Sequence, residues 1–264
     1  MEKERYVIRA AERTLQILNC FQGEREELSI SDIAGLVGLP KSSAHRFLVT
    51  LELNGFLEVN PLSHSYCLGR KVISLGSLAI SRVKLAEKGQ PYLLQLSKVV
   101  QATVHIVVIN QGEGIYIGKV EDRNSNISSY VSSYVGKRVP LYCTAVGKVL
   151  LGTLSPEEID NLYQKQGKLK SYTRNTITDL KLLKEHVQEV RDNGYAFDNE
   201  EIEEGLRCIA APIKNHEGRT IAAISVAGFA QKFSTDRLPE IIEQVQTTAA
   251  KISEIVGYNE KITV

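Results

Sequence analysis

The stretch Ser29–Asn54, SISDIAGLVGLPKSSAHRFLVTLELN, predicts two short helices joined by a tight turn. Ser29 is the expected N-cap of the first helix, with Asp32 at the position that completes a capping box. Gly38 suits the left-handed conformation that ends such a helix, and Pro40 suits the start of the next one. These local signals place one helix on each side of the turn.

Apolar residues repeat at the helical spacing i, i+3, i+4, i+7 in both predicted helices. They are Ile30, Ile33, Ala34 and Val37 in the first helix and Ala44, Phe47, Leu48 and Leu51 in the second. Two amphipathic helices joined by a turn of about four residues that contains glycine form a helix-turn-helix. The alternative is a helical hairpin whose polar face only meets water.

The outer face of the second helix carries short hydroxyls and cations, which suit phosphates and base edges. The candidates for contacts in the major groove of DNA are Ser42, Ser43, His45 and Arg46, and those for phosphate contacts are Lys41 and Thr50. If these residues bind DNA, the chain has its nucleic-acid site on one helix face.

Flanking segments complete a small domain. Ile8, Ala11, Leu15 and Leu18 predict an amphipathic helix before the stretch. Two β-like runs, Gly55–Asn60 and Ser65–Leu68, predict a hairpin after it, and a hairpin directly behind a recognition helix is a wing. Residues 1–68 are therefore expected to form a winged helix-turn-helix, with His64 at the wing tip as a further DNA contact. The alternative is a wing that only closes the small core.

Charge gives this domain no general attraction to nucleic acid. Residues 1–68 hold seven Lys and Arg against nine Asp and Glu, a net of −2, and the whole chain has +1. Phosphate neutralisation supplies much of the affinity for DNA, so clustering of the cations on one face would have to offset this sum. The cations that could cluster are Arg5, Arg9, Arg13, Lys41, Arg46, Arg70 and Lys71. The alternative function is a small-molecule sensor whose winged helix contacts protein.

The rest of the chain reads as a linker helix and an α+β domain. Residues 69–88 show apolar residues at helical spacing, and this helix is expected to pair with its twin in a dimer. After Gly89–Pro91 the pattern changes, and residues 89–264 are expected to form a largely antiparallel sheet flanked by helices. The expected strands are Thr103–Asn110, Gly114–Val120, Ile127–Val131, Tyr195–Asp198, Leu206–Ile213 and Thr220–Val226. The expected helices are Tyr92–Val100, Thr144–Gly152, Pro156–Tyr163, Leu180–Asn193 and Arg237–Val256.

Motifs for catalysis, metals and cofactors are missing from the sequence. The four cysteines form no C-x-x-C pair, and the five histidines form no H-E-x-x-H. Gly147-Lys148 fails as a P-loop, because Tyr142 and Val149 stand where that motif needs glycine and a hydroxyl. We expect no enzyme, no cofactor and no metal. An enzyme, or a redox switch using Cys143 or Cys208, is the third alternative.

Nothing in the sequence suggests a membrane or secretion. It has no apolar run of about 20 residues and no charged-then-apolar leader at Met1–Ala10. We expect a cytoplasmic protein that does not contact a membrane.

Three segments resemble the IclR family of bacterial transcription regulators, in order and at the family's spacing. They are LSISDIAGLVGLPKSSAHRFLVTL (Leu28–Leu51), TAVGKVLL (Thr144–Leu151) and DNEEIEEGLRCIAAPI (Asp198–Ile213). The resemblance implies a winged helix, a linker helix and a GAF-like effector domain. It also implies dimers that pair into tetramers, a palindromic operator, and a small effector that is often a carboxylate. Repression is the commoner mode in the family.

The resemblance also implies an effector site. Carried over residue by residue, it comprises Ala145, Val146, Asp198, Cys208 and Ser225. A helix N-terminus at Ala145 and Val146 would favour an anion. Ala227 and Tyr142 depart from the serine and histidine that are frequent in the family. The structural alternatives are a core thiol for Cys208, a turn cap for Asp198 and a backbone contact for Ser225.

Overall fold

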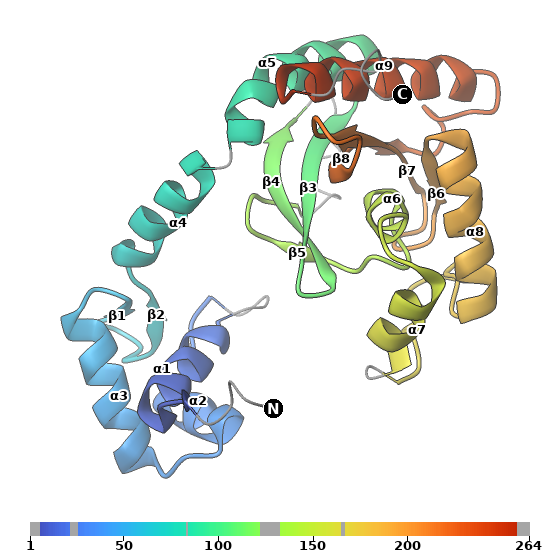
Figure 1. The fold of residues 1–264 in the computed structure, drawn as a ribbon. Coiled ribbons are helices and arrows are strands. Elements are labelled where there is room, and N and C mark those ends of the chain that lie inside the picture. Colours follow the sequence, from blue (N-terminus) through green and yellow to red (C-terminus); the bar gives the residue numbers. More distant parts are fainter. Residues whose placement is uncertain (1–5, 22–25, 83, 122–132, 165–166, 258–264) are drawn as a thin grey trace. The chain divides into compact units, whose positions relative to one another are not determined.

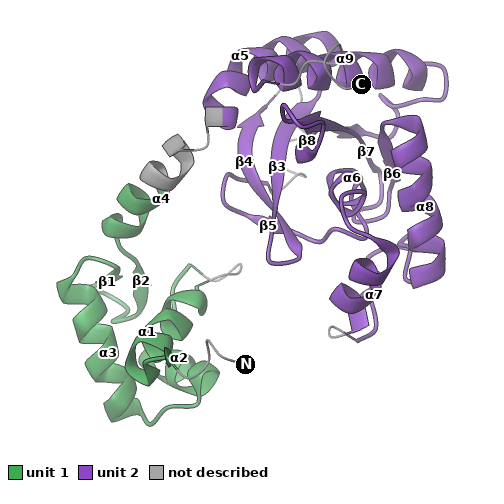
Figure 2. Ribbon diagram, in the orientation of Figure 1, with its two compact units in different colours: residues 1–82 green, residues 83–264 purple. Residues whose placement is uncertain are grey.

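The computed structural model describes residues 6–21, 26–82, 84–121, 133–164 and 167–257. The chain divides into two compact units, residues 1–82 and residues 83–264 (Figure 2). The division falls inside the segment 69–88 that the sequence predicts as a linker helix. Each unit has its own buried core and is described by itself.

Unit 1 contains the predicted helix-turn-helix and wing (Figure 1). Its elements are α1 (Arg9–Asn19), α2 (Ile30–Val37), α3 (Lys41–Leu53), β1 (Leu57–Val59), β2 (Tyr66–Leu68) and α4 (Arg70–Arg82). The two wing strands pair antiparallel, with Val59 opposite Tyr66. One cluster of buried apolar residues from α1, α2, α3 and the wing forms the core, and Ile17, Ile33 and Leu48 are fully buried in it.

The caps of α2 match the prediction. Ser29 Oγ accepts a hydrogen bond from the Asp32 N–H at 3.2 Å, and the Asp32 carboxylate accepts one from the Ser29 N–H at 3.2 Å. Gly38 ends the helix in the left-handed conformation with φ 62°. The backbone groups at both ends of α2 thus find hydrogen-bond partners within the stretch Ser29–Asn54. Local chemistry therefore determines where α2 ends and the turn into α3 begins.

The predicted buried face of α1 is partly wrong. Leu18 packs against the core as expected, but Ile8 and Leu15 are 71% and 61% exposed, and Ile17 is the fully buried residue. Apolar residues lie on more than one side of this helix, so spacing alone does not select a face. Contact with α2 and α3 selects the side that carries Ile17.

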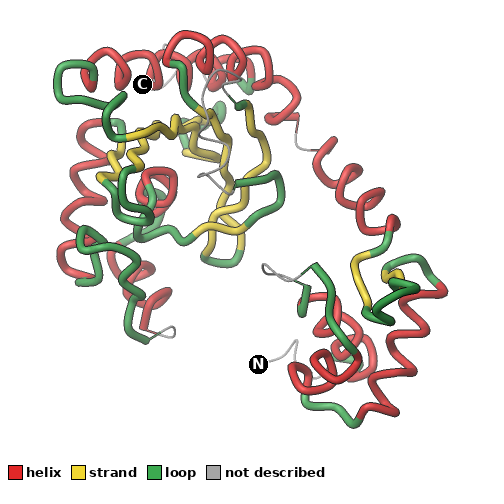
Figure 3. The backbone as a smooth tube through the Cα atoms, turned by 180° about the vertical axis from the view of Figure 1, so that it is seen from behind, coloured by secondary structure: helices red, strands yellow, loops and turns green. Residues whose placement is uncertain are grey.

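In the described part of unit 2, the sheet has six strands in the order β5-β4-β3-β8-β7-β6, and every neighbouring pair is antiparallel (Figures 1 and 3). The strands are β3 (Thr103–Asn110), β4 (Glu113–Val120), β5 (Arg138–Val139), β6 (Ala196–Asn199), β7 (Leu206–Lys214) and β8 (Thr220–Phe229). The helices are α5 (Lys84–Val100), α6 (Ala145–Leu151), α7 (Pro156–Gln164), α8 (Leu180–Asn193) and α9 (Leu238–Ile255). The predicted α+β class is confirmed.

Helices cover both faces of this sheet. Apolar residues of α5 and α9 pack on one face, against Val104, Ile209 and Ile224 among others. Helices α6, α7 and α8 pack on the other, against Val107 and Ala210. Alternate residues of each strand thus point into two separate cores.

The expected change of pattern after Gly89–Pro91 is not a helix boundary. Helix α5 runs from Lys84 through Pro91 to Val100. Leu85, Leu93 and Leu96 are buried on the same side of it, which keeps the helix continuous. The two-residue strand β5 was not predicted, because it is too short to show alternation. The predicted strand Ile127–Val131 lies outside the described residues.

Within the residues that the structure describes, no helix combines the length and apolar character needed to span a membrane.

Candidate functional sites

The first candidate site is the outer face of α3. Lys41, Ser42, His45, Arg46 and Thr50 are exposed, and Ser43 is half-buried. The opposite face of the same helix buries Ala44, Leu48 and Leu51 in the core. The structure therefore brings the predicted DNA-contact residues of α3 together on a surface that the fold does not use.

Thr50 differs from its neighbours on this face. Its hydroxyl donates a hydrogen bond to the Arg46 carbonyl at 2.8 Å. The proton of this hydroxyl is thus already engaged within the helix, and only its oxygen lone pairs remain to accept a bond from an outside group.

The wing tip is an ordered turn. His64 is exposed at a left-handed φ of 55°, and its N–H donates to the Asn60 carbonyl at 2.9 Å. Glu27, from the segment before α2, accepts hydrogen bonds from Asn60 Nδ2 at 2.6 Å and Ser63 Oγ at 2.8 Å. These bonds lower the pKa of the Glu27 carboxyl. The sequence predicted Glu27 only as a negative charge unfavourable to DNA binding. In the structure Glu27 holds the turn that carries His64.

The second candidate site lies on the sheet face of unit 2 that α6 covers. Strand register places Asp198 opposite Cys208, Cys208 opposite Ala227, and Ser225 opposite His105. Cys208 packs with the cluster around α6 and α8. Because side chains two residues apart along a strand share a face, the structure brings Asp198, Cys208 and Ser225 to one side of the sheet.

Ala145 and Val146 form the first turn of α6 and are buried, at 1% and 4% exposure. Thr144 caps this helix by accepting the Gly147 N–H at 3.1 Å, so one of the N–H groups expected to be free for an anion is already bonded. Gly147 cannot be enlarged, because a Cβ there would lie 2.1 Å from the Leu141 carbonyl oxygen. The loop before α6 thus lies directly against the helix.

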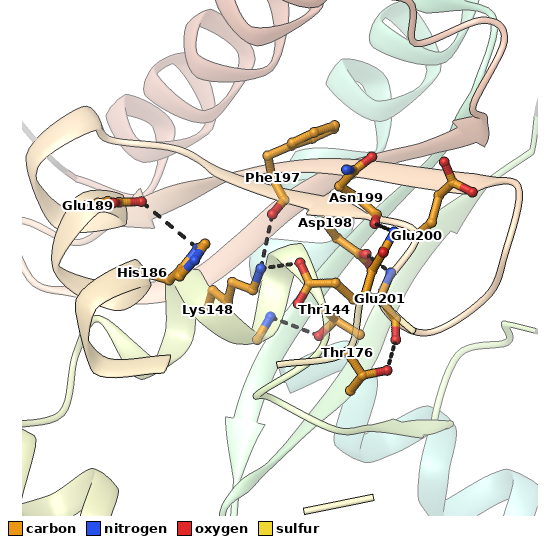
Figure 4. A network of polar contacts seen from close by, with 12 residues as sticks. Thr144, Lys148, Thr176, His186, Glu189, Phe197, Asp198, Asn199, Glu200 and Glu201 are labelled. Atoms are coloured by element: carbon orange, nitrogen blue, oxygen red, sulfur yellow. Dashed lines mark hydrogen bonds and ion pairs between the residues drawn. The ribbon is translucent and has the colours of Figure 1, made fainter. Parts of the chain in front are cut away.

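Asp198 belongs to a buried polar network (Figure 4). It is 1% exposed, and its Oδ1 accepts the Glu201 N–H at 2.8 Å. This bond is the turn cap that the sequence offered as an alternative. Burial raises the pKa of Asp198 from 3.8 to about 7, and the bond from Glu201 only partly offsets that rise. Near neutral pH the carboxyl can therefore donate as well as accept a hydrogen bond.

Lys148 and Glu201 form a buried ion pair beside Asp198. Their side chains are 1% and 6% exposed, and Lys148 Nζ also donates to the Phe197 carbonyl at 3.1 Å. The Thr176 hydroxyl donates to the Glu201 carbonyl at 2.6 Å. The pair joins α6 to the segment after β6. Sequence reasoning considered Lys148 only for a P-loop and did not consider Glu201.

His105 is a further residue that sequence reasoning missed. It is 2% exposed, its Nε2 lies 2.8 Å from Ser133 Oγ, and its ring centroid lies 4.9 Å from that of Tyr116. Burial lowers the pKa of His105 to about 3, so the imidazole is neutral. The alternation of β3, which places His105 next to Thr103 and Val107 on one face, was the available signal.

The thiols do not favour the nucleophile and redox alternatives. Burial raises the pKa of Cys143 to about 12 and that of Cys208 well above its ordinary value. Reactive cysteines have a lowered pKa, because the thiolate is the attacking species. Among the described residues, no group of three or more His, Cys, Asp and Glu could hold a metal ion.

Comparison with known proteins gives matches to both units. Residues 10–61 match the IclR helix-turn-helix domain, and residues 77–254 match the bacterial transcriptional regulator IclR C-terminal domain. The regulator XynR of Escherichia coli is 34% identical over 252 residues, which cover 96% of this chain and 98% of XynR.

Solved structures agree. IclR of Thermotoga maritima is 33% identical, covers 95% of this chain and 99% of its own, and has a TM-score of 0.71. An IclR homologue from Microbacterium hydrocarbonoxydans, crystallised with 4-hydroxybenzoate, shares the fold at 24% identity and a TM-score of 0.78, over 94% of this chain and 98% of its own. The matched families consist of regulators and not enzymes. This chain belongs to the IclR family of bacterial transcription regulators and carries its helix-turn-helix DNA-binding domain.

Proposed function

We propose that this protein is a ligand-responsive repressor. Paired winged helices bind a palindromic operator, and a small carboxylate metabolite bound in the C-terminal domain sets the affinity for that operator. In this proposal residues 1–68 bind DNA, residues 69–88 link, and residues 89–264 bind the effector. A regulator of chromosomal operators works in the cytoplasm, and we assign the chain there.

The observation that carries the proposal is the division of α3 into two faces. One face is fully used by the core, whereas the other offers Ser42, Ser43, His45 and Arg46 to an outside partner. A helix-turn-helix places the exposed face of its second helix in the major groove. Lys41 at the start of this face and His64 on the wing are assigned to the DNA backbone. Thr50 is assigned there as well, on the condition that its hydroxyl turns from the Arg46 carbonyl to a phosphate, because a phosphate oxygen only accepts hydrogen bonds.

The assignment of repression is supported by the relatives. AllR of Salmonella typhimurium, 31% identical over 94% of this chain, is named as a repressor. A palindrome requires two copies of the winged helix, with half-sites on one side of the duplex and about 34 Å or a multiple apart. We therefore propose a homodimer that assembles to a tetramer.

The effector assignment rests on the sheet face described above. Ala145 and Val146 have side chains small enough for a ligand to approach the backbone of α6, and Cys208 and Ser225 add weak and strong polar groups. Asp198 would repel a carboxylate if ionised. With its pKa raised to about 7, it can donate a hydrogen bond to a ligand carboxylate instead. The homologue crystallised with 4-hydroxybenzoate, itself a carboxylate, supports this class of ligand.

The first test is selection of the purified chain on fragmented genomic DNA from its own organism, beside Arg46→Ala. We expect the wild-type chain to enrich a short palindrome upstream of a metabolic operon. The selection is repeated with metabolites of a cell extract added, because the chain could bind its operator only when a small molecule is bound. If the folded wild-type chain enriches no more DNA than folded Arg46→Ala in either selection, DNA binding is excluded. Tight binding to protein that is insensitive to salt would then favour the sensor alternative.

The second test addresses the effector. Enzymes beside the palindrome restrict the candidate metabolites, and each carboxylate is titrated into the protein–operator complex. We expect one of them to release the operator from the wild-type chain, and Asp198→Asn and Ser225→Ala to require more of it. The control is Lys181→Ala, at an exposed position of α8, which should need no more metabolite than the wild-type chain. Tighter operator binding on addition of the metabolite would contradict simple release.

A further inference from the structure

A cleft of about 260 Å³ in unit 2 is separate from the effector residues. It lies where the turn between β3 and β4, the loop before α6, the end of α7 and the segment 168–172 meet. None of Ala145, Val146, Asp198, Cys208 and Ser225 lines it. Its lining includes Glu113, Tyr142, Tyr163, Lys168, Lys170 and Tyr172.

The floor of the cleft is aromatic and buried. Tyr142 and Tyr163 are 6% and 2% exposed, and their rings meet edge to face at 5.9 Å with an interplanar angle of 87°. The parts of these two rings that reach the cleft give it an aromatic floor, against which a third ring can pack edge to face or offset. The Tyr142 hydroxyl is already engaged, since it donates to the Lys170 carbonyl at 2.7 Å.

The hydroxyl of Tyr163 is different. It is buried and has no hydrogen-bond partner among the residues that the structure describes. The great majority of buried side-chain polar atoms have a partner, and an exception calls for an explanation. A ligand group that accepts or donates a hydrogen bond at the floor of the cleft would supply it.

The rim of the cleft is cationic. Lys168 and Lys170 are exposed there, and Lys170 Nζ lies 4.5 Å from the centroid of the Tyr172 ring. The carboxylate at this rim, Glu113, is offset by an ion pair with Arg138 at 2.6 Å. The remaining charge therefore favours an anion at the opening, above the apolar floor.

We propose that this cleft is a second small-molecule site, which takes a hydroxylated aromatic carboxylate. The ring lies on Tyr142, the ring hydroxyl bonds to the Tyr163 hydroxyl, and the carboxylate faces Lys168 and Lys170. The proposal does not depend on the identity of the effector or on the operator, because it uses no residue of either site.

The test measures binding of the three isomers of hydroxybenzoate to the full chain by titration calorimetry. We expect at least one isomer to bind, and Tyr163→Phe to weaken it about tenfold through loss of one hydrogen bond. Removing both rim charges, with Lys168→Ala and Lys170→Ala together, should weaken it further. Tyr195→Phe and Lys181→Ala are the matched controls. Because the effector site is also expected to take a carboxylate, the comparison is repeated in Asp198→Asn. Tyr163→Phe should still weaken binding about tenfold in that background, which separates the cleft from the effector site.

Melting curves recorded without hydroxybenzoate check that each variant is folded. Tyr163→Phe removes only a hydroxyl, so we expect a melting temperature equal to or above that of the wild-type chain. Equal affinity of Tyr163→Phe and the wild-type chain would overturn the proposal and indicate that water alone meets the hydroxyl. Loss of binding in Asp198→Asn, or no binding of any isomer up to about 10 mM, would overturn it as well.

Discussion

The exposed face of α3 and the buried polar face of the unit 2 sheet represent opposite ways of building a site. The candidate DNA contacts of that face all come from one helix, α3 (Figure 1), and none of them is among its buried residues. Asp198 and Glu201 lie three positions apart at the end of β6, and Lys148 comes from α6; all three are almost fully buried, and Glu201 bonds to both of the others (Figure 4). A substitution on α3 therefore tests recognition alone. A substitution in the sheet site tests recognition and stability together.

The strongest way to break this comparison is Lys148→Met. Removing one partner of a buried ion pair leaves the other charge without compensation, and we expect a loss of about 3–5 kcal/mol in the free energy of unfolding, measured with urea. Adding Glu201→Leu should recover much of that loss, because the carboxylate that lost its partner is then removed as well. The control is Lys184→Met, whose partner Asp160 lies 2.8 Å away and whose ion pair is partly exposed, at 28% and 34% for the two side chains. It should cost about 0–1 kcal/mol. Equal losses for both lysines would contradict our account of burial.

Asp198→Asn sharpens the comparison through pH. The folded pKa of about 7 lies above the ordinary 3.8, so folding takes up a proton between these values. This contribution to stability is full below pH 3.8 and disappears as pH rises to about 7, with a slope of at most about 1.4 kcal/mol per pH unit. Unfolding free energies measured from pH 4 to 8 should show that slope in the wild-type chain and not in the variant. Asp192→Asn, at an exposed position on α8, should keep it.

Arg46→Ala tests the opposite expectation for α3. If Arg46 reads a guanine, the variant should lose about 1–3 kcal/mol of operator binding and accept more bases at one position. Its unfolding free energy should stay within about 0.5 kcal/mol of the wild-type value, because the side chain is exposed. Binding to a set of single-base operator variants measures the first, and urea unfolding the second. Uniform weakening on every sequence would assign Arg46 to a phosphate.

Ser29→Ala should have the smallest effect. The substitution removes the side-chain half of the capping box that starts α2, at a cost of about 1 kcal/mol of stability. The outer face of α3 is not altered, so operator specificity should stay the same. Ser31→Ala, in the exposed part of the same helix, is the control for the change of residue type. A loss as large for Ser31→Ala would show that helix propensity, and not the cap, is responsible.

Sequence predicted unit 1 well where the signals were local. The capping box at Ser29, the left-handed Gly38 and the apolar spacing around Leu48 each involve residues within a few positions of one another. The face of α1 was only partly right, because which side is buried depends on α2 and α3. The continuation of α5 through Pro91 was missed for a related reason, since packing on the sheet outweighs the local signals for a break.

In unit 2 every described strand except β5 was predicted, but the polar network between them was not. The sequence predicted β3, β7 and β8, yet the partners of Lys148 depend on register and on the loop after β6. His105 and Ser133 likewise meet across 28 positions of sequence. The effector candidates Asp198, Cys208 and Ser225 came from family resemblance, and their location on one face follows from strand pairing that no local pattern contains.

The ion pair of Lys148 and Glu201 also limits how this chain can evolve. The two codons lie 53 positions apart, yet neither can drift freely, since a change in one leaves a defect that only a change in the other repairs. Descendants of this sequence should therefore keep both residues or replace both. The surface of α3 is under no such restriction, so new operators can be acquired one substitution at a time.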